Sequence, residues 1–158
     1  MCVLKYLLTF VLLPLLVFSQ EITLVDTSYL DAEKFIGIDF HDNSYYIKDQ
    51  ILLKKTNHSV FNFKDFQLGE IYSVDISNPM NIAVYYQDFN VVVLLDNKLS
   101  EIERINFNAI YEFINTSQVS IAANTSLWAF NLDSQQLELY NYRLEYIFQS
   151  LKNNNLCY

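Results

Sequence analysis

The sequence predicts an all-β fold built from antiparallel four-stranded units that repeat along the chain. Two observations support this class: β-rich runs alternate with short polar turns, and one segment of the chain aligns with a later one. A third is composition, because 52% of the 158 residues are hydrophobic and the chain contains 12 Tyr and 12 Phe. That content supplies a core, argues against disorder, and fits one domain or part of one.

The repeat appears when residues 84–102 are placed over residues 129–147, which align without a gap at an offset of 45. The matched positions are Asp88 with Asp133, Leu94 with Leu139, Asp96 with Asn141, Lys98 with Arg143, Leu99 with Leu144 and Ile102 with Ile147. A fainter copy at residues 44–63 places Asp49 at the position of Asp88. Repeats of about 40–45 residues are typical of β-propeller blades.

Each copy contains four β-rich runs in the same order. The runs are "KFIGIDF", "SYYIK", "QILLKK" and "SVFNF"; then "EIYSVDI", "NIAVYYQ", "VVVLL" and "LSEIERI"; then "SQVSIAA", "SLWAFNL", "QLELY" and "LEYIFQ". The stretch "VVVLL" is apolar on both faces, which predicts a strand covered on both sides, whereas "QLELY" alternates and predicts one more exposed face.

The polar residues between the runs are interpreted as turns. Asp49, Asp88 and Asp133 recur with the repeating unit, which is typical of hairpin-turn residues, and Asp96-Asn97 forms the next turn. Because the chain has only two glycines and two prolines, we expect Asn and Asp to serve most tight turns.

A family resemblance is carried by "IAVYYQD" at residues 82–88, with looser versions in "LWAFNLD" at 127–133 and "YYIKD" at 45–49. An apolar β-run leading into Tyr-x-x-Asp resembles the strand motif of YWTD and related NHL/TolB-like six-bladed propellers. The resemblance covers roughly residues 35–148, with Tyr86 where the motif has Trp. It implies a fold and binding through blade-edge loops, and implies no activity.

Three units, at about 35–70, 71–113 and 118–150, do not close a ring that normally needs 4–8 blades. Left open, the terminal sheets would expose edges and faces. The sequence therefore leaves three alternatives: an open or partial propeller that is a truncated product, assembly with copies of itself, or a sandwich of irregular hairpins. Residues 20–34 are expected to form a separate N-terminal segment, and residues 151–158 a disordered tail.

The first 19 residues predict a secretory signal peptide. Lys5 precedes an apolar stretch over residues 6–18, which is too short to span a bilayer comfortably, and Val17 and Ser19 fit a cut before Gln20. The alternative is an uncleaved anchor or a buried helix. Export leaves Cys157 as the only cysteine, so no internal disulfide is expected.

Charge limits the partners. The formal net charge is −8, and Lys and Arg do not cluster, which argues against nucleic acid and anionic membranes. The expected partners are a protein, peptide or glycan, with membrane contact only through the signal segment and with self-association left open.

The motifs for catalysis and metal binding are weak. Asp39, His41 and Asp42 are the only metal candidates, and we interpret them as a solvated strand end. The chain has no Gly-x-Ser-x-Gly elbow, and its two glycines exclude a phosphate loop. The sequence therefore predicts no catalytic residue, no metal and no cofactor.

Two features remain. Asn57-His-Ser59, Asn115-Thr-Ser117 and Asn124-Thr-Ser126 match the N-glycosylation pattern. Aromatic residues recur at matched positions, and we interpret them as packing between blades rather than as a stacking platform for a ligand. They are Tyr45, Tyr46, Tyr85, Tyr86, Trp128 and Phe130.

The resulting functional hypothesis is a non-catalytic exported binding or scaffold protein. Contacts are expected from loops around 41–44, 77–81 and 123–126, which follows from topology. The candidate residues are His41, Asp42, Asn43, Asn78, Asn81 and Asn124. The alternative is a fragment of a propeller hydrolase or lyase whose active site requires further blades, or a structural fragment without independent function.

Overall fold

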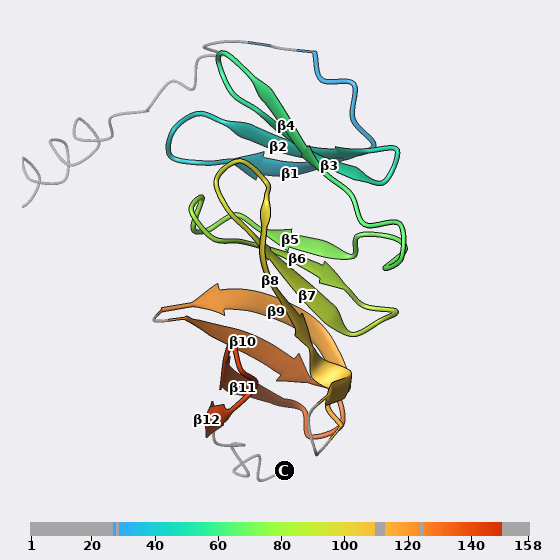
Figure 1. Ribbon diagram of the computed structural model, residues 1–158, viewed down its shortest axis with the longest axis vertical. Helices are drawn as coiled ribbons and strands as arrows, with labels where there is room; N and C mark the ends of the chain where they lie inside the picture. The colour runs from blue at the N-terminus through green and yellow to red at the C-terminus, as the bar shows by residue number, and fades with distance from the viewer. Residues whose placement is uncertain (1–26, 28, 110–112, 124, 150–158) are drawn as a thin grey trace, which may run out of the picture. The chain divides into compact units, whose positions relative to one another are not determined.

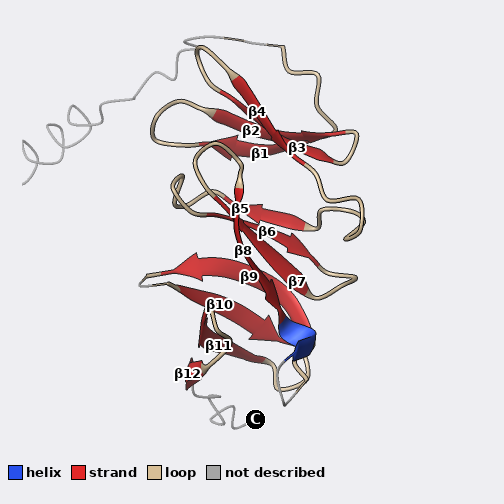
Figure 2. Ribbon diagram, in the orientation of Figure 1, coloured by secondary structure: helices blue, strands red, loops and turns tan. Residues whose placement is uncertain are grey.

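A computed structural model describes residue 27 and residues 29–109, 113–123 and 125–149 of the chain. The predicted signal segment at 1–19 and tail at 151–158 lie outside the described residues, as does Asn124. The chain divides into two units, 1–30 and 31–158, and the fold below belongs to the second. Its described residues form β-strands and one short 3-10 helix, Phe107–Ala109, so the predicted all-β class is confirmed (Figure 2).

The strands form three antiparallel four-stranded sheets, each in chain order (Figure 1). Sheet 1 contains β1 (Lys34–Ile38), β2 (Ser44–Lys48), β3 (Ile51–Lys55) and β4 (Val60–Phe63). Sheet 2 contains β5 (Ser73–Asp75), β6 (Ile82–Tyr86), β7 (Val91–Leu95) and β8 (Glu101–Asn106). Sheet 3 contains β9 (Thr116–Ala122), β10 (Ser126–Asn131), β11 (Gln136–Asn141) and β12 (Tyr146–Gln149).

The structure keeps the register of the sequence repeat. Strands β7 and β8 begin at Val91 and Glu101, and β11 and β12 begin 45 residues later, at Gln136 and Tyr146. Asp88 and Asp133 lie in the β6–β7 and β10–β11 turns, and Asp49 lies in the β2–β3 turn. The predicted turn roles of these three aspartates are therefore confirmed.

Sheet 2 lies between the other two sheets and contributes side chains to both interfaces (Figure 1). Successive side chains of a strand point to opposite faces, so β6 and β7 divide their apolar residues between two clusters. On β6, Val84 and Tyr86 join the cluster with sheet 1, whereas Ala83 and Tyr85 join the cluster with sheet 3. All residues of β6 and β7 are buried, as "VVVLL" predicts.

Sheets 1 and 3 each turn one apolar face toward sheet 2. In sheet 1, Tyr45 and Leu52 are fully buried in the interface, whereas their neighbours Tyr46 and Leu53 are partly exposed. In sheet 3, Leu127 and Ala129 are buried, and the alternating "QLELY" leaves Leu137 exposed. The predicted one-sided exposure of this strand is confirmed.

One turn geometry recurs after β1, β7 and β11. At its start Asp39, Asp96 or Asn141 accepts hydrogen bonds at Oδ1 from the backbone N–H groups two and four residues later, at 2.8–3.0 Å. The residue three positions on has a φ of 61–63° and donates its N–H to the carbonyl of the first residue. The side-chain oxygen thus replaces the strand pairing that ends there.

Fewer of the left-handed backbone positions are Asn or Asp than we expected. Among the described residues, eight other than glycine have positive φ, and only Asp42, Asp49 and Asn90 are of these two types. At Leu99 and Leu144 the side chain packs against the core. Apolar burial offsets the cost of roughly 1 kcal/mol or more for this backbone, and the Asx residue caps the turn from three positions before.

Polar groups also join neighbouring sheets. Lys54 of β3 donates from Nζ to the Asn97 carbonyl in the β7–β8 turn at 3.0 Å. Asp75 of β5 accepts from Ser120 Oγ at 2.5 Å and from the Ile121 N–H at 2.8 Å, both on β9. Burial alone raises the pKa of Asp75, but these hydrogen bonds outweigh it and lower the pKa, so the carboxylate joins sheets 2 and 3 in its charged form.

Candidate functional site

The predicted binding residues that the structure describes lie in two turns at one end of the strands. His41, Asp42 and Asn43 are in the β1–β2 turn, and Asn78 and Asn81 are in the β5–β6 turn. Antiparallel strands place these turns at the opposite end of β2 and β6 from the β2–β3 and β6–β7 turns. The structure does not test whether they contact a ligand, so this remains a prediction.

Three of these side chains support the local structure. Asn43 donates from Nδ2 to Asp39 Oδ2 at 3.0 Å. Asn78 accepts the Met80 N–H at 3.1 Å, and Asn81 donates to the Tyr142 hydroxyl. These bonds stabilise turns and the contact between sheets 2 and 3.

The interpretation of Asp39 as part of a solvated strand end is wrong. The Asp39 carboxylate is buried, and it accepts hydrogen bonds from the His41 and Asn43 backbone and from the Tyr45 hydroxyl at 2.9 Å. The His41 ring packs on Phe40, with 4.1 Å between ring centroids. Among the residues that the structure describes, no group of three His, Cys, Asp or Glu is arranged to hold a metal ion.

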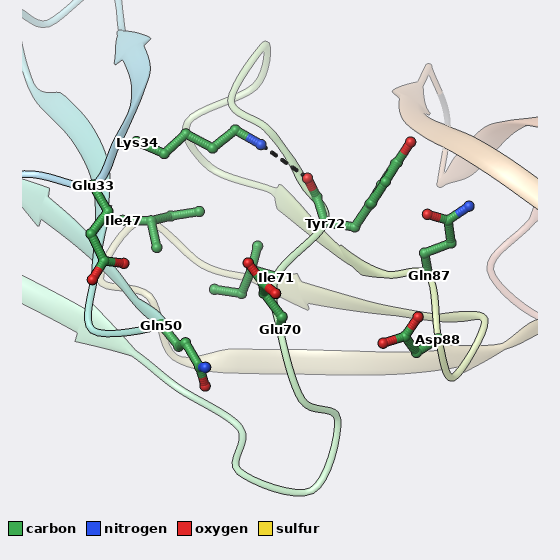
Figure 3. Close-up of a pocket in the computed structure, with 9 residues that line it drawn as sticks. All are labelled: Glu33, Lys34, Ile47, Gln50, Glu70, Ile71, Tyr72, Gln87 and Asp88. Atoms are coloured by element: carbon green, nitrogen blue, oxygen red, sulfur yellow. Dashed lines mark hydrogen bonds between the residues drawn. The ribbon is translucent and has the colours of Figure 1, made fainter.

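A pocket of about 460 Å³ opens at the other end of the strands, between sheets 1 and 2 (Figure 3). Four stretches of the sequence form it: the entry to β1, the β2–β3 turn, the β4–β5 connection and the β6–β7 turn. The lining residues are Glu33, Lys34, Ile47, Gln50, Glu70, Ile71, Tyr72, Gln87 and Asp88. Its volume is within the range of small-molecule sites.

Local backbone conformation shapes the walls of this pocket. Asp49 and Gln50 both have positive φ, which makes a tight two-residue hairpin whose twist matches that of the flanking strands. Gly69, with a φ of 72°, turns the β4–β5 connection before Glu70. Lys34 donates from Nζ to the Tyr72 carbonyl at 3.1 Å and so ties sheet 1 to this connection.

The pocket combines an apolar floor with a negatively charged rim. Ile47 and Ile71 are 6% and 5% exposed, and both belong to the core cluster between sheets 1 and 2. Glu33, Glu70 and Asp88 are exposed carboxylates, and Lys34 is the only basic residue among the described residues of the lining, which together carry two negative charges. Tyr72 is 40% exposed and meets the buried Tyr85 ring edge-on at 6.0 Å.

The side chains of this lining can attract a cation. The lining contains no Ser, Thr, Cys or His among the described residues, so the usual nucleophile and base of a hydrolase are missing from it. The carboxylates and the Tyr72 ring offer electrostatic and cation–π attraction to a cation, and the two isoleucines offer contact to an alkyl chain.

A smaller hollow of about 300 Å³ lies along β1, β5 and β9, the first strands of the three sheets. Asp75 is the charged residue of this hollow. Its Oδ1 accepts the Ser77 N–H at 2.8 Å, and its Oδ2 accepts the bonds from Ser120 and Ile121 described above. This hollow therefore has polar walls, but its carboxylate already accepts hydrogen bonds from the protein itself.

The pocket between sheets 1 and 2 is not evident from the sequence. Asp88 is recognisable there as a turn residue, whereas Glu33, Lys34, Glu70 and Tyr72 belong to no motif. The signal that could have revealed it is the group of charged residues at the end of the strands that carries the β2–β3 turn. Alignment of the repeats does not detect such a group.

Comparison with known proteins supports the fold alone. No family model matches the chain, and no curated protein matches it in sequence. Solved structures with a similar fold include two propeller proteins. The first is a catalytically inactive virginiamycin B lyase from Staphylococcus aureus crystallised with quinupristin, with a TM-score of 0.53 at 6% identity. The second is a streptogramin B lyase, with a TM-score of 0.54 at 7% identity.

Both alignments cover 77% of this chain and 41% of the lyase chain, so this chain spans about two fifths of the length of the structures it matches. At such identities the likeness identifies a partial propeller-like fold. In the described part of the chain, no helix is long and apolar enough to cross a membrane. The three sheets, their order and the lyase comparison together identify the architecture as propeller-like.

Proposed function

We propose that the chain is a non-catalytic exported binding protein whose pocket between sheets 1 and 2 takes a cationic side chain of a peptide. The observation that carries the proposal is the lining of that pocket. Three carboxylates surround two buried isoleucines and an exposed tyrosine ring, with one lysine among them. A Lys or Arg side chain has the matching parts, since its alkyl stem is apolar and its head is positively charged.

Lys34 does not neutralise this rim by a direct contact. Its ammonium donates to the Tyr72 carbonyl, and no ion pair between Lys34 and a carboxylate occurs among the described residues. The carboxylates of Glu33, Glu70 and Asp88 form no ion pair there either. A cationic ligand would therefore meet carboxylates not yet paired with a protein cation.

A peptide suits the site better than a glycan. A sugar ring is usually held by a stacking aromatic together with neutral hydrogen-bonding groups, whereas here charged groups predominate around Tyr72. The turns with His41 and Asn78 remain candidate contacts for a second partner on the opposite end of the strands. The resemblance to YWTD, NHL and TolB-like propellers fits binding by loops.

The test uses two neutral-capped amino acids of nearly the same shape, one with a cationic and one with a neutral side chain. N-acetyl-arginine amide and N-acetyl-citrulline amide are titrated into the 15N-labelled chain from residue 20 onward, and backbone NMR shifts are recorded. We expect the arginine compound to shift the signals of residues 70–72 and 87–88, with a dissociation constant in the millimolar range, about 4 kcal/mol of binding. Citrulline amide should shift them much less.

Variants locate the site. Glu70→Gln and Asp88→Asn should each weaken binding of arginine amide severalfold, because each removes one negative charge. Asp133→Asn is the matched control, since Asp133 occupies the same turn position in sheet 3 and lies outside the pocket. Equal binding of citrulline amide, or equal loss in the Asp133 variant, would refute the cationic site.

A second candidate is a fragment of a propeller lyase, which the fold of the two lyase structures favours. In that case the catalytic residues belong to sheets that this chain does not contain. A lyase fragment of this kind leaves quinupristin unchanged, so the titration with the two capped amino acids separates the candidates. A preference for arginine amide that depends on Glu70 and Asp88 supports the binding proposal, whereas equal shifts with citrulline amide favour the lyase fragment.

A further inference from the structure

The β3–β4 turn presents one of the three N-glycosylation patterns of the sequence on an exposed surface. The pattern is Asn57-His58-Ser59, and all three residues are exposed. Attachment at such a pattern requires an accessible asparagine, because the added sugar is bulky and hydrophilic. The turn meets this requirement.

Hydrogen bonds hold this turn without using the asparagine. Thr56 accepts the His58 and Ser59 N–H groups at its Oγ1, at 3.3 and 3.0 Å, and its own N–H donates to the Ser59 carbonyl at 2.9 Å. Among the described residues, the Asn57 carboxamide has no hydrogen-bond partner. A group attached to its nitrogen therefore breaks no contact of the fold.

The other two patterns lie in more constrained surroundings. Asn115 donates from Nδ2 to Asp133 Oδ1 at 3.3 Å, and the rest of its pattern belongs to β9, where Thr116 is 3% exposed. The third pattern begins at Asn124, outside the described residues, and ends at Ser126, which is 4% exposed. Only the first pattern lies wholly in an exposed turn of the described chain.

We propose that Asn57 is an attachment site for an N-linked glycan. Its Nδ2 forms a bond to the anomeric carbon of an oligosaccharide, supplied as a lipid-linked pyrophosphate. The bond from that carbon to the pyrophosphate breaks, the lipid pyrophosphate leaves, and one amide proton passes to the transferase. The inference depends on the predicted export and is independent of the binding pocket.

The position of Asn57 also keeps the glycan away from the pocket. Strand β3 separates the β3–β4 turn from Gln50 in the pocket lining, and its five residues span about 15 Å. The glycan would extend from the end of sheet 1 that carries the β1–β2 turn. Modification and cation binding are therefore compatible.

The experiment is translation of the full chain in the presence of microsomes from endoplasmic reticulum. We expect a form of lower gel mobility that peptide N-glycosidase removes, with Asn57 converted to Asp in the peptide map. Asn57→Gln and Ser59→Ala should each lose modification at this residue. Asn62→Gln is the matched control, because Asn62 is exposed on β4 and belongs to no such pattern.

Each outcome decides the proposal. A protected, protease-resistant chain that carries sugar on Asn57 supports it, whether or not Asn115 or Asn124 is modified too. A chain that enters the microsomes with Asn57 unmodified overturns it. A chain that does not enter them overturns it as well, because attachment requires export.

Discussion

The middle sheet and the two outer sheets use similar sequences in different surroundings. In sheet 2 all residues of β6 and β7 are buried, because sheets 1 and 3 cover both of its faces. In sheets 1 and 3 the buried residues alternate with partly exposed ones, because no described sheet covers the far face. The difference shows that the number of neighbouring sheets, rather than strand propensity, determines how apolar a strand is.

The repeat supplies a matched pair of residues that tests this difference between the middle and outer sheets. Leu94 and Leu139 occupy equivalent positions, and Leu94 is 1% exposed whereas Leu139 is partly exposed. We expect Leu94→Ala to lower the free energy of unfolding by about 4 kcal/mol, within the usual range for a buried leucine. Leu139→Ala should cost less than half as much. Urea denaturation at equal protein concentration measures both.

Equal costs for the two variants would show that the outer face of sheet 3 is covered in solution. A second copy of the chain is then the first candidate, and light scattering would reveal the larger mass. A cost at Leu139 that grows with protein concentration would identify self-association directly.

A second pair compares the recurrent turn in sheets 1 and 2. Asp39 is buried, accepts the Tyr45 hydroxyl in addition to its own turn, and lies 3.9 Å from the Lys54 ammonium. Its replacement by Ala leaves a buried cation and hydroxyl without their carboxylate, so we expect a loss of about 3 kcal/mol. Asp96→Ala removes only exposed turn bonds, and we expect about 1 kcal/mol. Denaturant unfolding compares them.

The dependence of stability on pH provides a second test of the Asp39→Ala variant. Burial alone raises the pKa of Asp39, but hydrogen bonds from Asn43, His41 and Tyr45 outweigh it and lower the pKa. A depressed pKa gives stability that is present above the unfolded-state pKa and is lost as pH falls through the folded-state pKa. Stability of the variant should therefore fall less steeply below about pH 4. An unchanged acid dependence would contradict this role of Asp39.

The sequence predicts much of the architecture because residues at matched positions of a repeat have equivalent structural surroundings. The alignment of Asp96 with Asn141 and of Leu99 with Leu144 identified turns that share hydrogen bonds and backbone angles. The apolar "VVVLL" indicated a strand with two covered faces. These features are local, or depend only on which face of a strand is buried.

The candidate site depends on contacts that a repeat does not encode. Glu33, Glu70 and Asp88 come from three separate stretches, and no periodicity relates them. Topology favoured the turns at His41 and Asn78, whereas the pocket between sheets 1 and 2 opens at the opposite end of the strands. Which end of a sheet carries a cavity is decided by how neighbouring sheets diverge, and this requires the three-dimensional arrangement.

The most direct test of the account measures the exposure of individual methyl groups. A soluble gadolinium chelate broadens the NMR signals of methyl groups that water reaches, and the assigned Val and Leu signals report both outer sheets at once. We expect Val92, Val93 and Leu94 to remain sharp and Leu53 and Leu137 to broaden strongly. Leu53 and Leu137 as protected as Val93 would contradict the enclosed middle sheet with uncovered outer faces.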